Sequence, residues 1–182
     1  MQVLRRVPPG ARHEFGRFLQ CVAGGRVWLM ATNALYLEHG RQDAPGRDAF
    51  DDMVATNALM FAGDLAGAAD RLMAGFARTP QCPFVVTMLI QAHIHLSAKA
   101  LDMARLAATA DLIDRHATLL TPGLRRHLVA YVAATRALCA GECELARRRF
   151  WEAHKAIRGT FELTRALQIA AAQGGVRANY VA

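Results

Sequence analysis

The chain has 182 residues, of which 53% are hydrophobic and 20% charged, enough apolar material for one domain with a continuous core. No apolar run approaches the roughly 20 residues that a membrane-spanning helix needs. Its four cysteines follow a start without the apolar block of a secretory signal, so we expect reduced thiols in a cytoplasmic protein. The excess of Arg over Lys is typical of a GC-rich genome, and we expect a bacterial source.

Apolar periodicity, glycines and prolines predict helices and no strands. The helices are expected over residues 11–22, 26–39, 47–61, 65–78, 84–97, 100–119, 123–139, 143–157 and 160–173. Thr121 offers a hydroxyl that can cap a helix start. Pro122 follows it, and the missing N–H of a proline costs nothing in the first turn of a helix. Asp48, with Asp51 and Asp52, places carboxylates at the positive end of another helix. Helical hairpins are then expected to begin near residues 11, 47, 84 and 124, which is a nearly constant period.

A phrase recurs at residues 59–80 (LMFAGDLAGAADRLMAGFARTP) and 138–157 (LCAGECELARRRFWEAHKAI). In each, a glycine is followed at the same spacings by a small, a bulky apolar and another small residue. The first copy has Gly63, Ala68, Leu72 and Gly75, and the second has Gly141, Ala146, Phe150 and Ala153. Glycine tolerates the backbone of a tight turn, and only a small residue fits where two helices cross closely. The two glycines are separated by two repeats of about 39 residues, a period that indicates stacked helical hairpins.

Both copies resemble the tetratricopeptide repeat, whose glycine, alanine, aromatic, alanine and proline correspond to Gly63, Ala68, Leu72, Gly75 and Pro80. The second copy lacks the proline, and both lack the large aromatic expected early in the first helix. The resemblance covers roughly residues 47–159. It implies an all-α fold of stacked antiparallel helical hairpins, a tetratricopeptide-like α-solenoid with residues 160–173 as a C-terminal capping helix. We therefore expect one helical-repeat domain over 1–173 and a flexible tail over 174–182, with a plain helical bundle as the rival architecture.

In such a solenoid the first helix of each hairpin lines a concave groove. The residues expected to line it are Met53, Asn57, Met60, Phe61, Leu89, His93, Leu96, Tyr131 and Thr135. An apolar wall with a row of hydrogen-bonding groups suits a peptide or an amphipathic helix. The sequence thus predicts an adaptor or chaperone-like protein whose partner is another protein. The alternative is that these residues pack against a neighbouring hairpin.

Both ends of the sequence are basic: residues 1–26 contain five basic and one acidic side chain, and residues 121–182 contain ten basic and four acidic side chains. The run Arg147, Arg148 and Arg149 is the candidate basic patch. It suggests a second function, a helical protein associated with nucleic acid through phosphate contacts. The alternative is a solvated helix side opposite a buried stripe of Ala146, Phe150, Ala153 and Ile157.

The sequence offers no support for catalysis, a cofactor or a metal ion. His93 and His95 are two positions apart, so on a helix they point about 200° apart and cannot share one ion. Cys139 and Cys143 are accompanied by no second Cys or His pair at ligand spacing. Phosphate-binding glycine loops and the common hydrolase motifs are also missing. We therefore expect a binding protein and not an enzyme.

Overall fold

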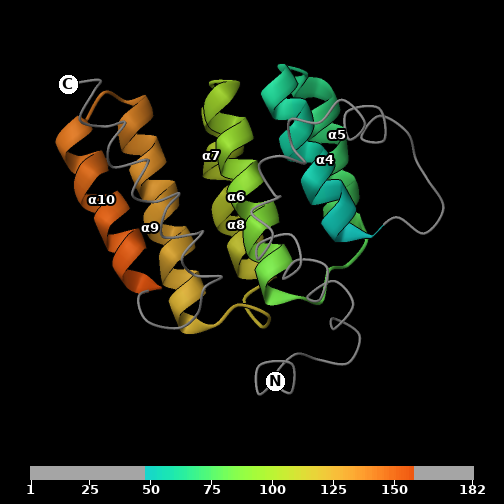
Figure 1. Cartoon of the computed structure of the whole chain (residues 1–182). Helices are drawn as coiled ribbons and strands as arrows, with labels where there is room; N and C mark the ends of the chain where they lie inside the picture. Colours follow the sequence, from blue (N-terminus) through green and yellow to red (C-terminus); the bar gives the residue numbers. More distant parts are fainter. Residues whose placement is uncertain (1–47, 158–182) are drawn as a thin grey trace, which may run out of the picture. The chain divides into compact units, whose positions relative to one another are not determined.

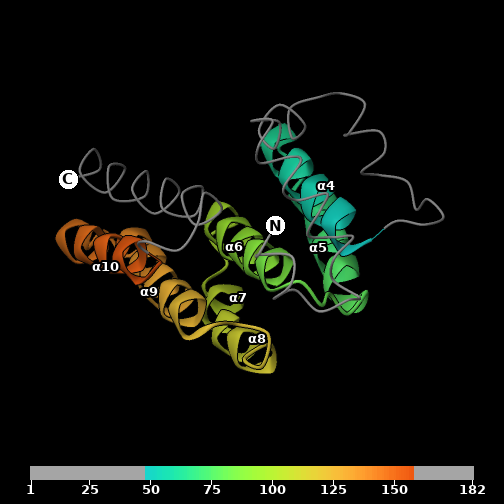
Figure 2. The ribbon, with the colours of Figure 1, turned by 60° about the horizontal axis from the view of Figure 1, so that its bottom comes forward.

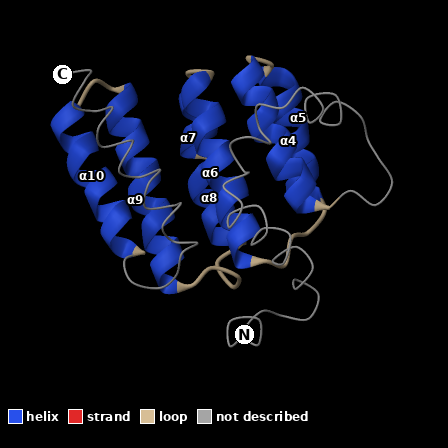
Figure 3. Cartoon of the chain, in the orientation of Figure 1, coloured by secondary structure: helices blue, strands red, loops and turns tan. Residues whose placement is uncertain are grey.

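The computed structural model describes residues 48–157. Over that range the chain is all-α, and only helices and connecting loops occur (Figure 3). The helices are α4 (Ala49–Ala62), α5 (Leu65–Ala77), α6 (Pro83–Lys99), α7 (Met103–Ala107), α8 (Thr109–Arg115), α9 (Pro122–Cys139) and α10 (Cys143–Ala156). The predicted helices over 11–22, 26–39 and 160–173 lie outside the described residues. So do both ends of the expected domain and the tail over 174–182, which stay predictions.

The described chain divides into two compact units at Leu96 and Ser97. The N-terminal unit (residues 48–96) contains α4, α5 and most of α6, and the C-terminal unit (97–157) contains α7 to α10. In the first, α4 and α5 lie side by side as a hairpin, and in the second α9 and α10 do the same (Figures 1 and 2). Each unit therefore has one of the two hairpins that carry the recurring phrase.

Both predicted helix starts are confirmed by their caps. Asp48 and Asp51 form a reciprocal capping box at the start of α4, each side chain accepting a hydrogen bond from the other's backbone N–H at 2.9 and 3.1 Å. At the start of α9 the Thr121 hydroxyl accepts from the Leu124 N–H at 3.3 Å, ahead of Pro122. These contacts are local in the sequence and fix where the helices begin. The sequence could therefore indicate both helix starts.

The recurring phrase supplies the hairpin crossings. Its bulky and small residues are all buried: Ala68, Leu72, Gly75, Ala146, Phe150 and Ala153. A Cβ added to Gly75 would lie 2.9 Å from Leu89 Cδ2 and 3.3 Å from Asp52 Cβ, so only glycine fits there without displacement. The buried stripe expected on α10 is therefore confirmed, and Ile157, directly after the helix, is buried with it.

A third copy of the hairpin turn lies between α6 and α7, where the sequence has no glycine. At Gly63 and Gly141 the backbone is left-handed, with φ of 83° and 78°, and at Leu101 φ is 53°. Each of these residues donates to the carbonyl three positions back, and the next residue donates to the carbonyl five positions back. These bonds are Gly63–Met60, Asp64–Leu59, Leu101–Ala98, Asp102–Ser97, Gly141–Leu138 and Glu142–Ala137, with N···O distances of 2.9 to 3.3 Å. The three turns recur at nearly equal intervals along the chain, close to the expected period.

The predicted helix over 100–119 is wrong in its details. It starts only at Met103, because Leu101 closes the preceding turn and the Asp102 side chain caps the new helix by accepting from the Arg105 N–H at 2.8 Å. It then breaks at Ala108 into α7 and α8, and α8 ends at Arg115.

Leu101 gives a direct test of the third turn. Its side chain is 76% exposed, so the left-handed backbone is not compensated by burial. Because a non-glycine residue in that conformation costs about 1–2 kcal/mol, Leu101→Gly is expected to raise the free energy of unfolding by about 1 kcal/mol. The matched change Gly141→Leu should lower it by a similar amount. Urea denaturation of both variants measures this, and a loss of stability in Leu101→Gly would contradict the assigned turn.

Candidate functional site

The predicted groove residues are mostly interior. Seven are buried, namely Met53, Met60, Leu89, His93, Leu96, Tyr131 and Thr135. Asn57 is half-buried, and its Nδ2 donates to the Met53 carbonyl at 3.0 Å within α4. Phe61, in the last turn of α4, is 50% exposed. Of the nine, Phe61 alone therefore presents a large surface to a partner in this structure.

The two predicted groove residues on α9 contribute to the core of their own hairpin. The ring of Tyr131 meets Phe150 of α10 edge-on, with centroids 5.2 Å apart, and the Thr135 hydroxyl donates to the Tyr131 carbonyl at 2.9 Å. Both belong to the C-terminal unit, whereas the other seven belong to the N-terminal unit. They therefore pack within their own hairpin, whereas the alternative drawn from the sequence was packing against a neighbouring hairpin.

The basic patch is largely paired along α10. Arg147 donates two hydrogen bonds to Glu144 at 2.6 and 2.9 Å, and Arg149 donates one to Glu152 at 2.7 Å. The hydrogen bond from Arg147 lowers the pKa of Glu144, and the same contact raises the pKa of Arg147. Arg148 is exposed. The run is thus a solvated helix side whose charge is partly neutralised by neighbouring carboxylates.

An open groove that the sequence did not indicate lies between α9 and α10 in the C-terminal unit. It has a volume of about 1060 Å³ and reaches the loop between α8 and α9. Its described lining consists of Ala117, Leu120, Pro122, Arg125, Arg126, Val129, Ala130, Ala133, Arg149, Glu152, Lys155 and Ala156. We call it the α9–α10 groove.

The floor of the groove is apolar and made of short side chains. Ala130 and Ala133 on α9 and Ala156 on α10 leave the space open, because an alanine fills less of the surface between two helices than a larger residue would. Val129 beside them is 54% exposed, a large fraction for an apolar side chain on a helix. The floor therefore offers apolar area that the described chain leaves uncovered.

The rim of the groove is basic. It has four cationic side chains, Arg125, Arg126, Arg149 and Lys155, against Glu152. Arg125 pairs at 2.7 Å with Asp114 of α8, and Arg149 pairs with Glu152. Arg126 and Lys155 form no ion pair within the residues that the structure describes. Because the two existing pairs are solvent-exposed, each contributes about 0–1 kcal/mol and can be exchanged for another carboxylate.

Three of these cations lie at one end of the groove. The helices are antiparallel, so the start of α9 meets the end of α10, and a Cβ on Gly123 would lie 3.0 Å from the Ala156 carbonyl oxygen. Arg125 and Arg126 are in the first turns of α9, and Lys155 is in the last turn of α10. The groove is consequently asymmetric along its length, with the positive charge concentrated where α9 begins.

Within the α9–α10 hairpin, His127 is buried and ties the two helices together. Its Nδ1 lies 2.9 Å from the Ala153 carbonyl oxygen, and since a carbonyl only accepts, Nδ1 carries the proton. Burial lowers the pKa of His127, with a smaller effect of His154 in the same direction, against the raising effect of the bond to Ala153. The histidine is therefore neutral in the folded protein at pH 7.

The lowered pKa predicts a loss of stability in acid. The unfolded chain binds a proton at His127 near pH 6.5 and the folded chain only at a lower pH, so stability is retained above about 6.5 and falls below it. The slope from this group is at most about 1.4 kcal/mol per pH unit. Urea denaturation at pH 7.5 and 5.5 should show a smaller pH dependence in His127→Gln than in the wild type. Equal dependence in both proteins would contradict a neutral His127.

Within residues 48–157, no three His, Cys, Asp or Glu side chains lie close enough together to hold a metal ion. None of the helices described has both the length and the apolar character needed to cross a membrane. Cys139 and Cys143, on either side of the Gly141 turn, are free thiols.

No protein-family model, curated protein or solved structure matches this chain. The resemblance to the tetratricopeptide repeat stays a prediction.

Proposed function

We propose that this protein is a binding module, an adaptor or chaperone-like protein that holds a peptide or helical segment of another protein. The observation that supports this most is the α9–α10 groove, in which half-exposed Val129 stands beside a floor of alanines. The groove is open and larger than most small-molecule sites, which enclose their ligand in about 300–1,000 Å³. An open groove of this size suits part of a macromolecule.

We also propose that the hairpins form a tetratricopeptide-like solenoid. Three identical hydrogen-bonded turns at Gly63, Leu101 and Gly141 support a repeated unit. The hairpin starts support it too, because α4, α6 and α9 begin at similar intervals, at Ala49, Pro83 and Pro122. Repeat proteins of this kind use their surfaces to bind other proteins.

The exposed thiol of Cys139 suits a reducing compartment, and we propose that the protein is cytoplasmic.

Nucleic-acid binding is the second candidate. Trp151 is 47% exposed on α10, close in sequence to exposed Arg148 and Lys155, and an exposed aromatic among cations can stack on a base. Against it, Glu144 and Glu152 neutralise two of the three arginines of the basic patch. Apolar floor area, which a phosphate backbone cannot use, also favours a protein partner.

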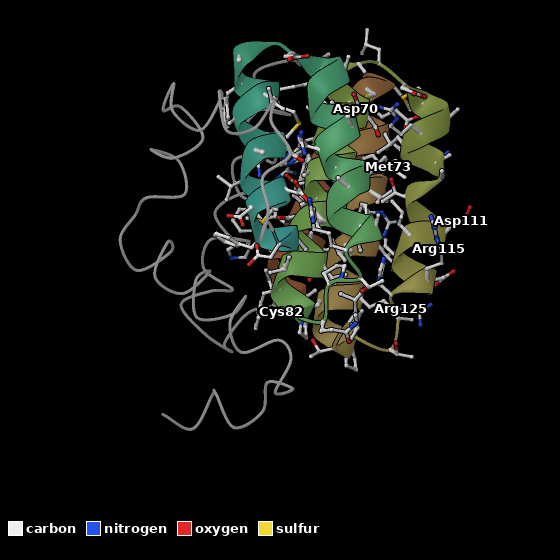
Figure 4. The ribbon with its side chains drawn as sticks, turned by 90° about the vertical axis from the view of Figure 1, so that its right-hand side faces the viewer. Asp70, Met73, Cys82, Asp111, Arg115 and Arg125 are labelled. Carbon is white, nitrogen blue, oxygen red and sulfur yellow. The ribbon has the colours of Figure 1, made fainter. Side chains whose placement is uncertain are left out.

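A charge placed beside the alanines of the floor should weaken segment binding strongly. Val129→Glu puts a carboxylate where the proposed partner buries apolar surface, and the expected loss is at least about tenfold in affinity. Peptides selected from a displayed random library on the wild-type protein should bind this variant weakly. Met73→Glu is the matched control, because Met73 lies 62% exposed on the outward face of α5, near Asp70 (Figure 4). Selection of no peptide, or equal binding to wild type and Val129→Glu, would contradict the proposed function.

A further inference from the structure

Resting on the proposed function, we infer that the segment held in the α9–α10 groove is an acidic amphipathic helix. Its apolar face would cover Val129, Ala130 and Ala133, and its carboxylates would meet Arg126 and Lys155.

Charge indicates the acidic character. The groove has four cations and one anion in its described lining, and two of the cations, Arg126 and Lys155, form no ion pair with the described residues. A partner with Asp or Glu beside its apolar face would pair with both. A basic segment would instead face like charges. The chain's own residues 158–182 contain three Arg and one Glu, so their composition does not match this rim.

The backbone groups of the groove walls indicate that the bound segment is a helix. The walls of the groove are the sides of α9 and α10, whose N–H and C=O groups are already bonded along each helix. An extended segment would find no strand edge there to satisfy its own backbone groups, whereas a helix satisfies them internally. Side chains of a helix also fit between those of two neighbouring helices.

The arrangement of the cations predicts an orientation. Arg125, Arg126 and Lys155 are gathered at the end where α9 begins, while the floor continues toward Ala133. The acidic residues of the bound helix are therefore expected at one end of its apolar stripe. That acidic end would lie near the start of α9, beside Arg125, Arg126 and Lys155. Nucleic acid fits less well, because the described lining contains no aromatic ring on which a base could stack.

Three fluorescein-labelled helical peptides, each about five turns long, test this inference with the full chain. They share one leucine stripe and differ only in having Glu, Gln or Lys beside it, and an oligothymidylate of similar length serves as the nucleic-acid probe. Fluorescence anisotropy at low and physiological salt gives each affinity. We expect the Glu peptide to bind at least about tenfold more tightly than the Gln peptide, the Lys peptide not to bind, and the preference to shrink in salt.

The double variant Arg126→Glu/Lys155→Glu should reverse the order of the Glu and Lys peptides. Both side chains are exposed, so the variant is expected to fold, which circular dichroism checks. Arg115→Glu/Arg136→Glu, exposed cations outside the groove lining, is the matched control and should behave as wild type.

The other outcomes separate the two proposals. Equal binding of Glu and Gln peptides that Val129→Glu removes would overturn the acidic partner and leave segment binding standing. Binding of none of the three designed peptides would overturn the acidic helix, and failure of the displayed library to yield any binder would overturn segment binding as well. Oligothymidylate binding that exceeds that of the Glu peptide and disappears in the double charge variant would overturn the protein partner in favour of nucleic acid.

Discussion

Phe150→Ala is expected to lower the free energy of unfolding by about 3–5 kcal/mol, the largest effect of any single change considered for this chain. Phe150 is buried at the centre of the α9–α10 hairpin, where its ring contacts Tyr131 edge-on. Truncation removes both the buried ring area and this contact, and it leaves a cavity between helices whose backbones are held by other contacts. Chemical denaturation monitored by circular dichroism measures the loss.

The adjacent tryptophan provides the control. Trp151 is also a large aromatic residue but is half-exposed, and its ring meets only His154 among the ring contacts described. Trp151→Ala should therefore cost less than about 1 kcal/mol. Comparable losses in the two variants would mean that the face of α10 toward α9 has been assigned incorrectly.

Asp52→Ala is expected to destabilise the N-terminal unit by about 3 kcal/mol. The Asp52 side chain is fully buried in the α4–α5 hairpin, where Oδ2 accepts from Arg78 Nε at 2.5 Å and Oδ1 lies 3.8 Å from an Arg71 amino group. Removing the carboxylate takes away a buried partner of both guanidinium groups. Because Arg78 is one-third exposed, water offsets part of the cost, which places the estimate at the low end for a buried pair.

An exposed aspartate on the same hairpin provides the comparison. Asp70→Ala, on the outward face of α5 (Figure 4), should change stability by less than about 0.5 kcal/mol. Asp52→Asn keeps the shape and one acceptor but not the charge, so an intermediate loss is expected. If Asp52→Ala proved as stable as Asp70→Ala, the buried ion cluster would contribute nothing to the hairpin.

Within residues 48–157, the helices other than α7 and α8 and two of the three turns were predictable from the sequence because their determinants are local. Gly63 and Gly141 mark left-handed turns, and Thr121 and Pro122 mark a helix start, each through a preference of the residue itself. The turn at Leu101 was not predictable in this way, since leucine has no preference for a positive φ. The signal that remained was spacing: Leu101 lies about midway between the two glycines, and the residue after it caps the next helix, as the residue after Gly63 does.

The binding site was harder to predict because burial depends on the whole fold. Met53 and Met60 were expected to face a groove, but α4 is buried on nearly all sides. Its buried residues also include Val54 and Ala55. The buried residues of α4 include the polar Asp52 and Thr56, so its sequence did not mark it as an interior helix. The α9–α10 groove was harder to recognise in the sequence, because alanines such as those that line it also occur where two helices cross closely.

Alanine-methyl NMR of the full chain, titrated with the Glu peptide, tests the central claim most directly. Ala130, Ala133 and Ala156 line the α9–α10 groove, whereas Ala62 follows Phe61 at the end of α4. We predict that the methyl signals of Ala130, Ala133 and Ala156 shift on binding and that the signal of Ala62 does not. Shifts at Ala62 with unchanged signals at Ala130 and Ala133 would contradict the account and place the partner at the end of α4.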